Sequence, residues 1–367
     1  MSQLKLELAE GWAEVAPRSD APEFVAEVDG RLVHLGSDFS CRRDFGPVGP
    51  VECPLAIDQL NLRVFRYVSK AGFGSGQDYS HIRAFDLRTG KSFPVIELPL
   101  NQWVLWMLEW IGGSEGKVGQ LIGLVASDRT NARGVTIEHQ LFALTPGEPA
   151  IRRRPLCRDA YRPLAFSRRR RELVFSGAEG TYLLGLNGER KQSLFKGRCT
   201  TAEGASFDPL GAARVVLAGG GIHIWDTESG RCNQLAAKGR HPVWSSDGHR
   251  IYFRESSSDL HYIDLSNGER TCLLSVAGQQ ARELWFAQPI CFSPCSRYAA
   301  APVSSRRLRG VQQNASSGGE RERVYRYAHA TVIMDFEKCE LWLCEGMASR
   351  IEWLGGARKK VPASAVC

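Results

Sequence analysis

Short apolar runs alternate with polar turns along most of the chain, and the pattern is clearest in three consecutive segments. These are residues 165–195, 206–235 and 243–274. Each segment reads as strand, polar turn, strand, short turn, strand, glycine turn and strand. Runs such as RIYF and LHYIDL are rich in aromatic and branched residues, which suit half-buried strands. The pattern predicts consecutive four-stranded antiparallel sheets.

Two sets of turn positions recur at intervals near 40 residues. Five turn glycines give intervals of 57, 41, 42 and 38 residues: Gly90, Gly147, Gly188, Gly230 and Gly268. Aromatic residues before the first polar turn give intervals of 41, 37 and 48 residues: Phe166, Phe207, Trp244 and Phe292. Two independent registers of similar length indicate a repeat architecture.

The turns explain why the unit repeats. Aspartates such as Asp226 and Asp264 can bind backbone amides two residues on, and the following glycine supplies the positive φ that a tight hairpin needs. One four-stranded sheet of this size cannot bury its faces alone, so copies must stack. Stacking around an axis produces a β-propeller.

The repeat resembles known propeller families. HIWDTESGR at 223–231 is similar to the end of a WD40 repeat, and VWSSDGHRIYF and CFSPCSRYAAAPV resemble the first turn of WD40-like and TolB-like repeats. The chain departs from the pattern at Arg168–Arg171, where proline, aspartate and glycine are usual, and at Cys339, which replaces a turn glycine.

The repeats predict an all-β fold, a β-propeller of four-stranded antiparallel blades. Six blades are expected over 55–98, 100–156, 162–196, 203–236, 241–276 and 288–346. A seventh would combine the hairpin at 24–38 with 350–355, so that strands from both ends close the ring; six or eight blades remain alternatives. Residues 1–355 would form the single propeller domain, and residues 356–367 a disordered tail.

Composition and charge limit the expected location of the protein and the kind of partner it could bind. The N-terminal segment lacks the apolar run of a signal peptide, and no stretch approaches the length of a membrane span. With 11 cysteines at irregular spacing, reduced thiols and a cytoplasmic location are expected. Residues 1–150 hold 14 basic and 19 acidic residues and residues 151–367 hold 33 and 21, so the net charges are −5 and +12. The second half could therefore meet an acidic partner.

Three middle turns are expected to be long loops, at 69–81, 127–134 and 304–323, on the face opposite the first and third turns. Loops on a rigid scaffold often carry function, and ring closure would bring these three into one sector. The other reading of 304–323 is a disordered insertion without a role. Candidate partner-binding residues in and beside the loops are Tyr79, Arg129, Arg133, Arg306, Arg307, Arg309, Arg321, Arg323, Tyr325 and Tyr327.

No catalytic constellation emerges from the motifs. GGSEG around Ser114 is followed by a strand, not by the helix of a nucleophile elbow. AGFGSGQ at 71–77 lacks the context and the lysine of a nucleotide-binding loop. No catalytic residue, cofactor or metal ligand is therefore assigned, and a non-catalytic role is favoured over an enzymatic one.

Three functions remain open. The first is a non-catalytic scaffold that binds another protein, with an acidic surface as one option, through the long loops. The second is a hydrolase or lyase acting on a peptide or carbohydrate at the central channel. The third is nucleic-acid binding through arginine clusters, although Arg168–Arg171 are expected to form a solvated turn on the face opposite the long loops.

Overall fold

A computed structural model gives the fold of the chain. It describes residues 5–28, 31–47, 55–58, 61–70, 79–98, 102–112, 119–131, 134–145, 154–157, 160–177, 180–186, 191–196, 204–277, 284–286, 290–293, 295, 297–313, 321–346 and 348–354. Strands and turns make up all of the regular structure in these ranges. The described part of the chain holds no helix that could cross a membrane. The predicted tail at 356–367 lies outside the described residues.

The described strands form seven sheets. One sheet joins the two ends of the chain in the order β31-β3-β4-β5: Ala348–Trp353, Phe24–Val28, Arg31–Leu35 and Cys41–Pro47. The next contains β6 to β9: Leu55–Asp58, Arg63–Lys70, Tyr79–Asp86 and Ser92–Leu98. The third contains β10 to β13: Gln102–Ile111, Gln120–Asn131, Gly134–Leu144 and Arg154–Cys157.

The second half of the chain repeats this arrangement. Two four-stranded sheets hold β14 to β17 (Ala160–Ser167, Glu172–Gly177, Gly180–Gly185, Lys191–Lys196) and β18 to β21 (Ala205–Phe207, Arg214–Ala218, Ile222–Asp226, Cys232–Ala236). The next holds β22 to β25: Arg240–Trp244, Arg250–Arg254, Asp259–Asp264 and Arg270–Val276. In the last sheet, β26 (Leu284–Phe286) and β27 (Cys291–Phe292) both pair with β28 (Tyr298–Gln313), followed by β29 (Arg321–Asp335) and β30 (Glu340–Glu345).

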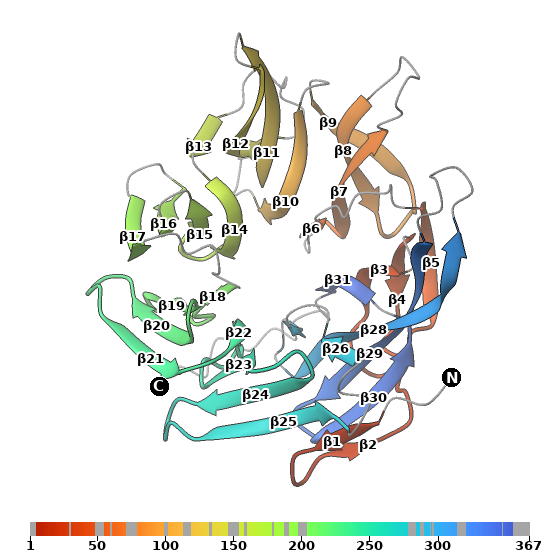
Figure 1. Ribbon diagram of the computed structural model, residues 1–367. Coiled ribbons are helices and arrows are strands. Elements are labelled where there is room, and N and C mark those ends of the chain that lie inside the picture. The colour runs from red at the N-terminus through yellow and green to blue at the C-terminus, as the bar shows by residue number, and fades with distance from the viewer. Residues whose placement is uncertain are drawn as a thin grey trace, which may run out of the picture.

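The sheets stand around a common axis, with the strands β31, β6, β10, β14, β18, β22 and β27 nearest to it (Figure 1). Contacts between neighbouring inner strands run from β31 to β6, β10, β14, β18 and β22, and β27 returns to β31. The all-β propeller predicted from the sequence is confirmed. The expected sheet with strands from both ends of the chain is also present, and its innermost strand is the C-terminal β31.

The third turns repeat one hydrogen-bonding pattern. An aspartate ends the third strand and accepts hydrogen bonds from backbone amides of the turn, as Asp226 does from Glu228 and Ser229. Gly230 then adopts a φ of 71°, and Cys339 stands at the equivalent place with a φ of 54°. The predicted replacement of a turn glycine by Cys339 is therefore a left-handed residue in the structure.

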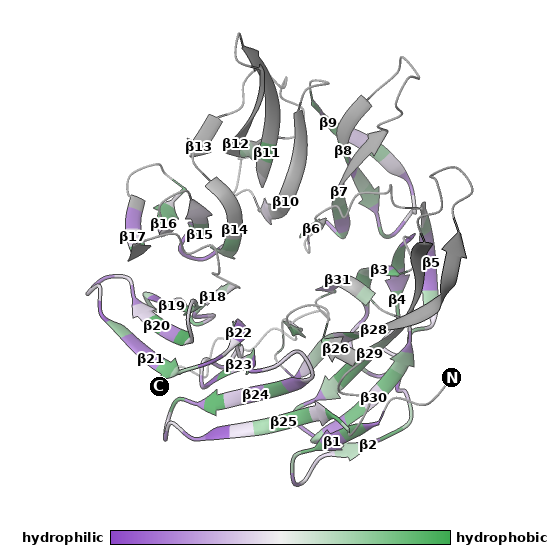
Figure 2. Ribbon diagram, viewed as in Figure 1, coloured by the Kyte–Doolittle hydropathy of each residue, from purple (hydrophilic) through white to green (hydrophobic). Residues whose placement is uncertain are grey.

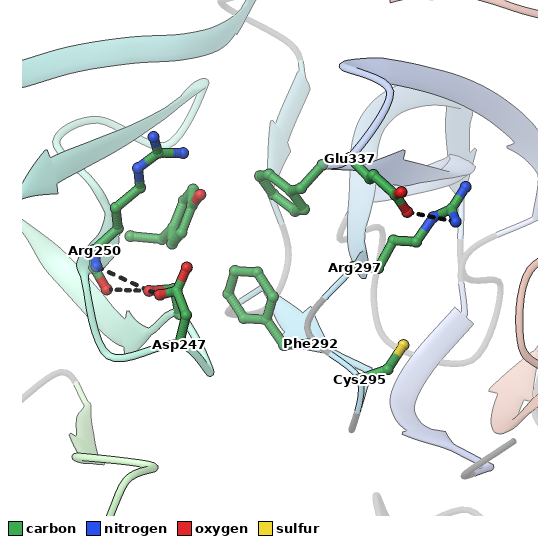
Figure 3. A pocket seen from close by; sticks show the side chains of 9 residues that line it. Asp247, Arg250, Phe292, Cys295, Arg297 and Glu337 are labelled. Carbon is green, nitrogen blue, oxygen red and sulfur yellow. Dashed lines mark hydrogen bonds and ion pairs between the residues drawn. The ribbon is translucent and has the colours of Figure 1, made fainter. Parts of the chain in front are cut away.

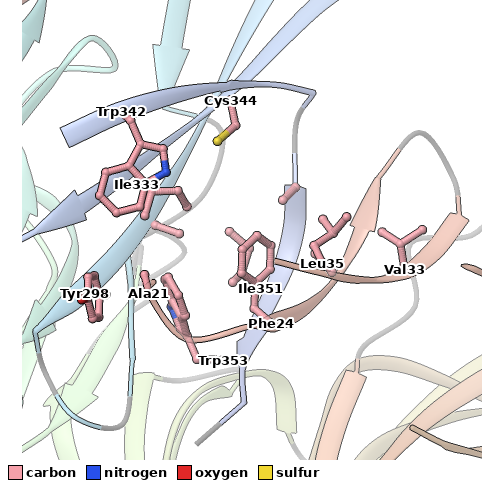
Figure 4. Packing of buried hydrophobic residues seen from close by; sticks show 13 residues of the cluster. Ala21, Phe24, Val33, Leu35, Tyr298, Ile333, Trp342, Cys344, Ile351 and Trp353 are labelled. Atoms are coloured by element: carbon pink, nitrogen blue, oxygen red, sulfur yellow. The ribbon is translucent and has the colours of Figure 1, made fainter. Parts of the chain in front are cut away.

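Alternation of hydrophobic and hydrophilic positions produces the core between the sheets. In Figure 2 the turn between β24 and β25 is hydrophilic, whereas the strands beside it carry hydrophobic residues. One cluster of buried side chains joins the last sheet to the closing sheet β31-β3-β4-β5. Its members Phe24, Trp342 and Trp353 are all at most 3% exposed (Figure 4). The Trp353 indole Nε1 also donates to the Cys291 carbonyl at 2.9 Å. Burial of aromatic rings across this seam stabilises the closed ring.

The N-terminal segment forms a strap across two outer edges. β1 (Leu6–Leu8) pairs antiparallel with β25, and β2 (Ala13–Glu14) pairs parallel with β30. Between them, Trp12 packs edge-on against Phe336 with ring centroids 5.3 Å apart. The segment thus ties two neighbouring sheets together before the chain enters its own sheet at β3.

Candidate functional site

The strands of the middle hairpins are longer in three sheets than in the other four, where they have 5 or 6 residues each. β7 and β8 have 8 residues each, β11 and β12 have 12 and 11, and β28 and β29 have 16 and 15. The equivalent β19 and β20 have only 5 each. These three hairpins lie at the same ends of their sheets, because all middle turns share one face of an antiparallel propeller.

The described parts of the expected long loops are therefore paired strands. Pairing continues from Ser69 opposite Ser80 to Lys70 opposite Tyr79, and through Asn131 opposite Gly134. Between β28 and β29 it reaches Gln313 opposite Arg321. The described parts of 69–81, 127–134 and 304–323 thus correct the loop prediction, while 71–78, 132–133 and 314–320 lie outside the described residues.

Seven of the ten predicted partner-binding residues belong to the β28–β29 ribbon. Its backbone register places Arg306 opposite Tyr327, Leu308 opposite Tyr325, Val311 opposite Arg323 and Gln313 opposite Arg321; Arg307 faces Arg326, and Arg309 falls at the register shift. The other positions belong to other sheets: Tyr79 begins β8 and Arg129 lies in β11 opposite Thr136. Arg133 lies outside the described residues.

The three long hairpins belong to sheets in one part of the ring, but they are not all on adjacent sheets. The ribbon belongs to the last sheet, whereas β7–β8 and β11–β12 belong to the second and third sheets of the ring. The sheet that closes the ring, β31-β3-β4-β5, stands between them (Figure 1). The three hairpins therefore occupy one arc of the ring, with a closing sheet inside that arc.

On the opposite face, a cavity of about 290 Å³ lies between the last two sheets (Figure 3). First turns contribute Ser245, Asp247, Cys295 and Arg297 to its wall, and the third turn of the last sheet adds Phe336 to the floor and Glu337 to the wall. Strands β23 and β27 provide the floor. The lining residues are Ser245, Asp247, Arg250, Tyr252, Phe292, Cys295, Arg297, Phe336 and Glu337.

Three aromatic rings form the apolar floor of this cavity. The centroid of the Tyr252 ring lies 5.0 Å from that of Phe292 and 5.3 Å from that of Phe336, and the two phenylalanine rings are 5.5 Å apart. Burial raises the pKa of Tyr252 to about 12, because the charged phenolate would be poorly solvated. Its hydroxyl therefore stays protonated at neutral pH.

Each side of the floor carries one acidic residue and one arginine: Asp247 with Arg250, and Glu337 with Arg297. The two arginines differ in the side chains that they contact. Arg297 donates to both carboxylate oxygens of buried Asp335, at 3.0 and 2.7 Å, and also lies 2.5 Å from Glu337. The Asp335 hydrogen bond raises the pKa of Arg297. Arg250 instead reaches Asp264 at 3.4 Å and stacks over the Tyr262 ring, 4.9 Å from its centroid.

Asp247 is fixed by its own turn. Partial burial opposes ionisation, but hydrogen bonds from the Ser245 hydroxyl at 2.5 Å and the His249 amide at 2.9 Å lower the pKa of Asp247 overall. This carboxylate is thus held ionised at the wall. Across the part of the chain with described side chains, no group of three or more His, Cys, Asp or Glu residues is placed to hold a metal ion.

The cavity was not predicted from the sequence. Its walls come from turns that lie far apart in the sequence, at Asp247, Cys295 and Glu337. The turn motifs alone do not show that these turns share a cavity. The available signal was the aromatic residue of each repeat next to its first turn, as in CFSPCSR. By contrast, Arg168–Arg171 do form the first turn between β14 and β15, as predicted, and Arg170 pairs with Glu172 there.

Comparison with known structures places the chain among β-propellers. Oligogalacturonate lyase in complex with manganese is 14% identical, with a TM-score of 0.51, and the match covers 82% of this chain and 95% of that chain. Oligogalacturonate lyase from Vibrio parahaemolyticus is 12% identical, with a TM-score of 0.52 and coverage of 82% and 90%. TolB from Acinetobacter baumannii is 10% identical, with a TM-score of 0.39 and coverage of 80% and 83%.

At this level of identity the likeness concerns the fold. No protein-family model and no curated protein sequence matches the chain.

Proposed function

We propose that the chain is a non-catalytic protein-interaction module that binds another protein through the hairpins β7–β8, β11–β12 and β28–β29. The observation that supports this proposal is the elongation of these three hairpins on one face of a propeller whose other described hairpins are short. Strands of 15 and 16 residues exceed what a blade needs for its core. A ribbon beyond the core stabilises little by itself, which favours a role in contacts with a partner.

The composition of the ribbon favours an acidic or polar partner. Between residues 306 and 327 the sequence holds six arginines and two glutamates, a net charge of +4. Arginine and tyrosine are also the residues that most often anchor protein interfaces. In this proposal the contacts come from the predicted set at Tyr79, Arg129 and Arg133, together with the ribbon residues Arg306, Arg307, Arg309, Arg321, Arg323, Tyr325 and Tyr327.

The test is quantitative affinity capture with a shortened ribbon. Residues 307–326 are replaced by Asn-Gly, which can close a two-residue hairpin between Arg306 and Tyr327. This change removes five arginines and two glutamates, a net charge of +3. A control with Arg88→Gln, Arg231→Gln and Lys338→Gln removes the same net charge from third turns on the other face.

Partners captured by the intact chain and by the control should be lost with the shortened ribbon. Equal recovery by all three chains would contradict the proposal. Loss of the captured material after nuclease treatment would instead support nucleic-acid binding, and that binding should weaken steeply with salt.

A lyase or hydrolase acting at the central channel is the second candidate. Two propellers of similar fold are named oligogalacturonate lyases, and one of them was solved with manganese. The chain is incubated with oligogalacturonate, with and without Mn²⁺, and new unsaturated product is followed by ultraviolet absorbance. No product is expected; its formation would contradict the non-catalytic proposal.

A further inference from the structure

We propose that the cavity between the last two sheets binds the C-terminal residue of a partner polypeptide. Its apolar side chain would lie on the rings of Phe292 and Phe336, and its carboxylate would pair with Arg250. This site is on the face opposite the long hairpins and does not depend on the function proposed for them.

The size of the cavity suits a single residue. At about 290 Å³ it lies at the lower end of the range for ligand pockets. The three-ring floor offers apolar contact, and each of its rings is held by the others, so little side-chain entropy is lost on binding. A large apolar side chain is the group that such a floor binds best.

The two arginines at the wall differ in how many of their donors are already used, and the ionised Asp247 lies on the same side as Arg250. Arg297 already has two carboxylates, from Asp335 and Glu337, so a ligand would gain little from it. Arg250 makes one long hydrogen bond to Asp264, a side-chain hydrogen bond with Tyr252 and a contact with the Tyr262 ring, and its side chain is 43% exposed. The exposed part of its guanidinium can therefore donate to a ligand carboxylate in a charge-assisted pair.

The surface beside the cavity favours a polypeptide over an isolated small molecule. Leu210, in the next first turn, is 54% exposed and lies against Gly248: a Cβ placed on Gly248 would come 3.0 Å from Leu210 Cδ1. The Leu210 carbonyl accepts a hydrogen bond from Arg169, which lies in the first turn of the neighbouring sheet, between β14 and β15. Residues upstream of the C-terminus would thus cross an apolar side chain and then reach the exposed arginines Arg169 and Arg171, which complement acidic residues.

Fluorescence anisotropy with a labelled peptide tests the proposal on the full chain. The peptide is Glu-Glu-Ser-Ser-Leu-Phe, prepared with a free C-terminal carboxylate and as the amide. The free acid should bind saturably, and the amide about tenfold or more weaker, because a charge-assisted hydrogen bond is lost. Equal affinities, or no saturable binding of the acid, would overturn the proposal.

Variants assign the binding to this cavity. Arg250→Gln should weaken binding of the acid to the level of the amide, whereas Arg231→Gln, in an exposed turn away from the cavity, should leave both affinities unchanged. Arg250 also contacts Asp264 and Tyr262, so a second pair of variants is made at Cys295, which is exposed at the wall of the cavity. Cys295→Trp should block binding, and Cys295→Ser should preserve it. Unimpaired binding by Cys295→Trp would place the peptide elsewhere.

Discussion

At the scale of single residues, the third turns depend on one aspartate and one left-handed position. Asp86, Asp226 and Asp264 each accept backbone hydrogen bonds from their turn, and these bonds help to lower the pKa of each carboxyl group. Gly90, Gly230 and Gly268 follow with φ of 71–73°. Cys339 shows that a side chain can occupy this position, at the energetic cost of a left-handed backbone.

Gly268→Ala isolates that cost. A Cβ at Gly268 would meet nothing within 4 Å, so the penalty comes from its φ of 73° alone. The free energy of unfolding should fall by about 1 kcal/mol, measured by urea denaturation. Gly185→Ala is the matched control, because its Cβ also meets nothing within 4 Å and its φ lies outside the left-handed range. If both substitutions have the same effect, backbone conformation does not set the cost.

At the scale of elements, the N-terminal strap holds the two sheets that also form the cavity. β1 extends the sheet of β25 and β2 extends the sheet of β30, with Trp12 between them on Phe336. Phe336 belongs at once to the strap contact and to the cavity floor. The strap therefore helps to position one ring of the proposed peptide site.

Removal of the Trp12 ring should weaken this connection. Trp12 is half-buried, so Trp12→Ala should lower the free energy of unfolding by about 2 kcal/mol, less than for a fully buried aromatic residue. Glu10→Ala, an exposed change on the same segment, should stay within about 0.5 kcal/mol. Chemical denaturation of the two variants gives the comparison, and equal stabilities would show that the strap does not pack through Trp12.

The elements also show where sequence patterns succeed and fail. Strands that bury one face, such as Arg250–Arg254, carry aromatic and branched residues, so their repeat could be predicted. Residues 306–313 and 321–323 pair beyond the core of their sheet and have no regular apolar alternation, so the sequence pattern predicts a loop there. β1 and β2 add to outer edges, where few apolar residues are needed, and they were missed. The cavity needed three turns to be placed together, which a one-dimensional pattern does not give.

At the scale of the whole molecule, closure of the ring depends on strands from opposite ends of the chain. β31 pairs with β3, and the seam to the last sheet is filled by Trp353. Its ring lies 5.3 Å from that of Phe24, and its indole Nε1 bonds the Cys291 carbonyl. One side chain thus connects the N-terminal strand, the C-terminal strand and the last sheet.

Trp353→Ala should open this seam, because it leaves a large cavity and removes the hydrogen bond to the Cys291 carbonyl. We expect a loss of about 3–5 kcal/mol in the free energy of unfolding and faster amide exchange in both β3 and β27. Trp353→Phe keeps a ring but loses the hydrogen bond, and should cost less. Phe93→Ala, on the outer strand β9 and 41% exposed, is the control for loss of an aromatic ring away from the seam. Faster exchange in β3 alone would mean that the closing sheet is secured by strand pairing and not by its packing on the last sheet.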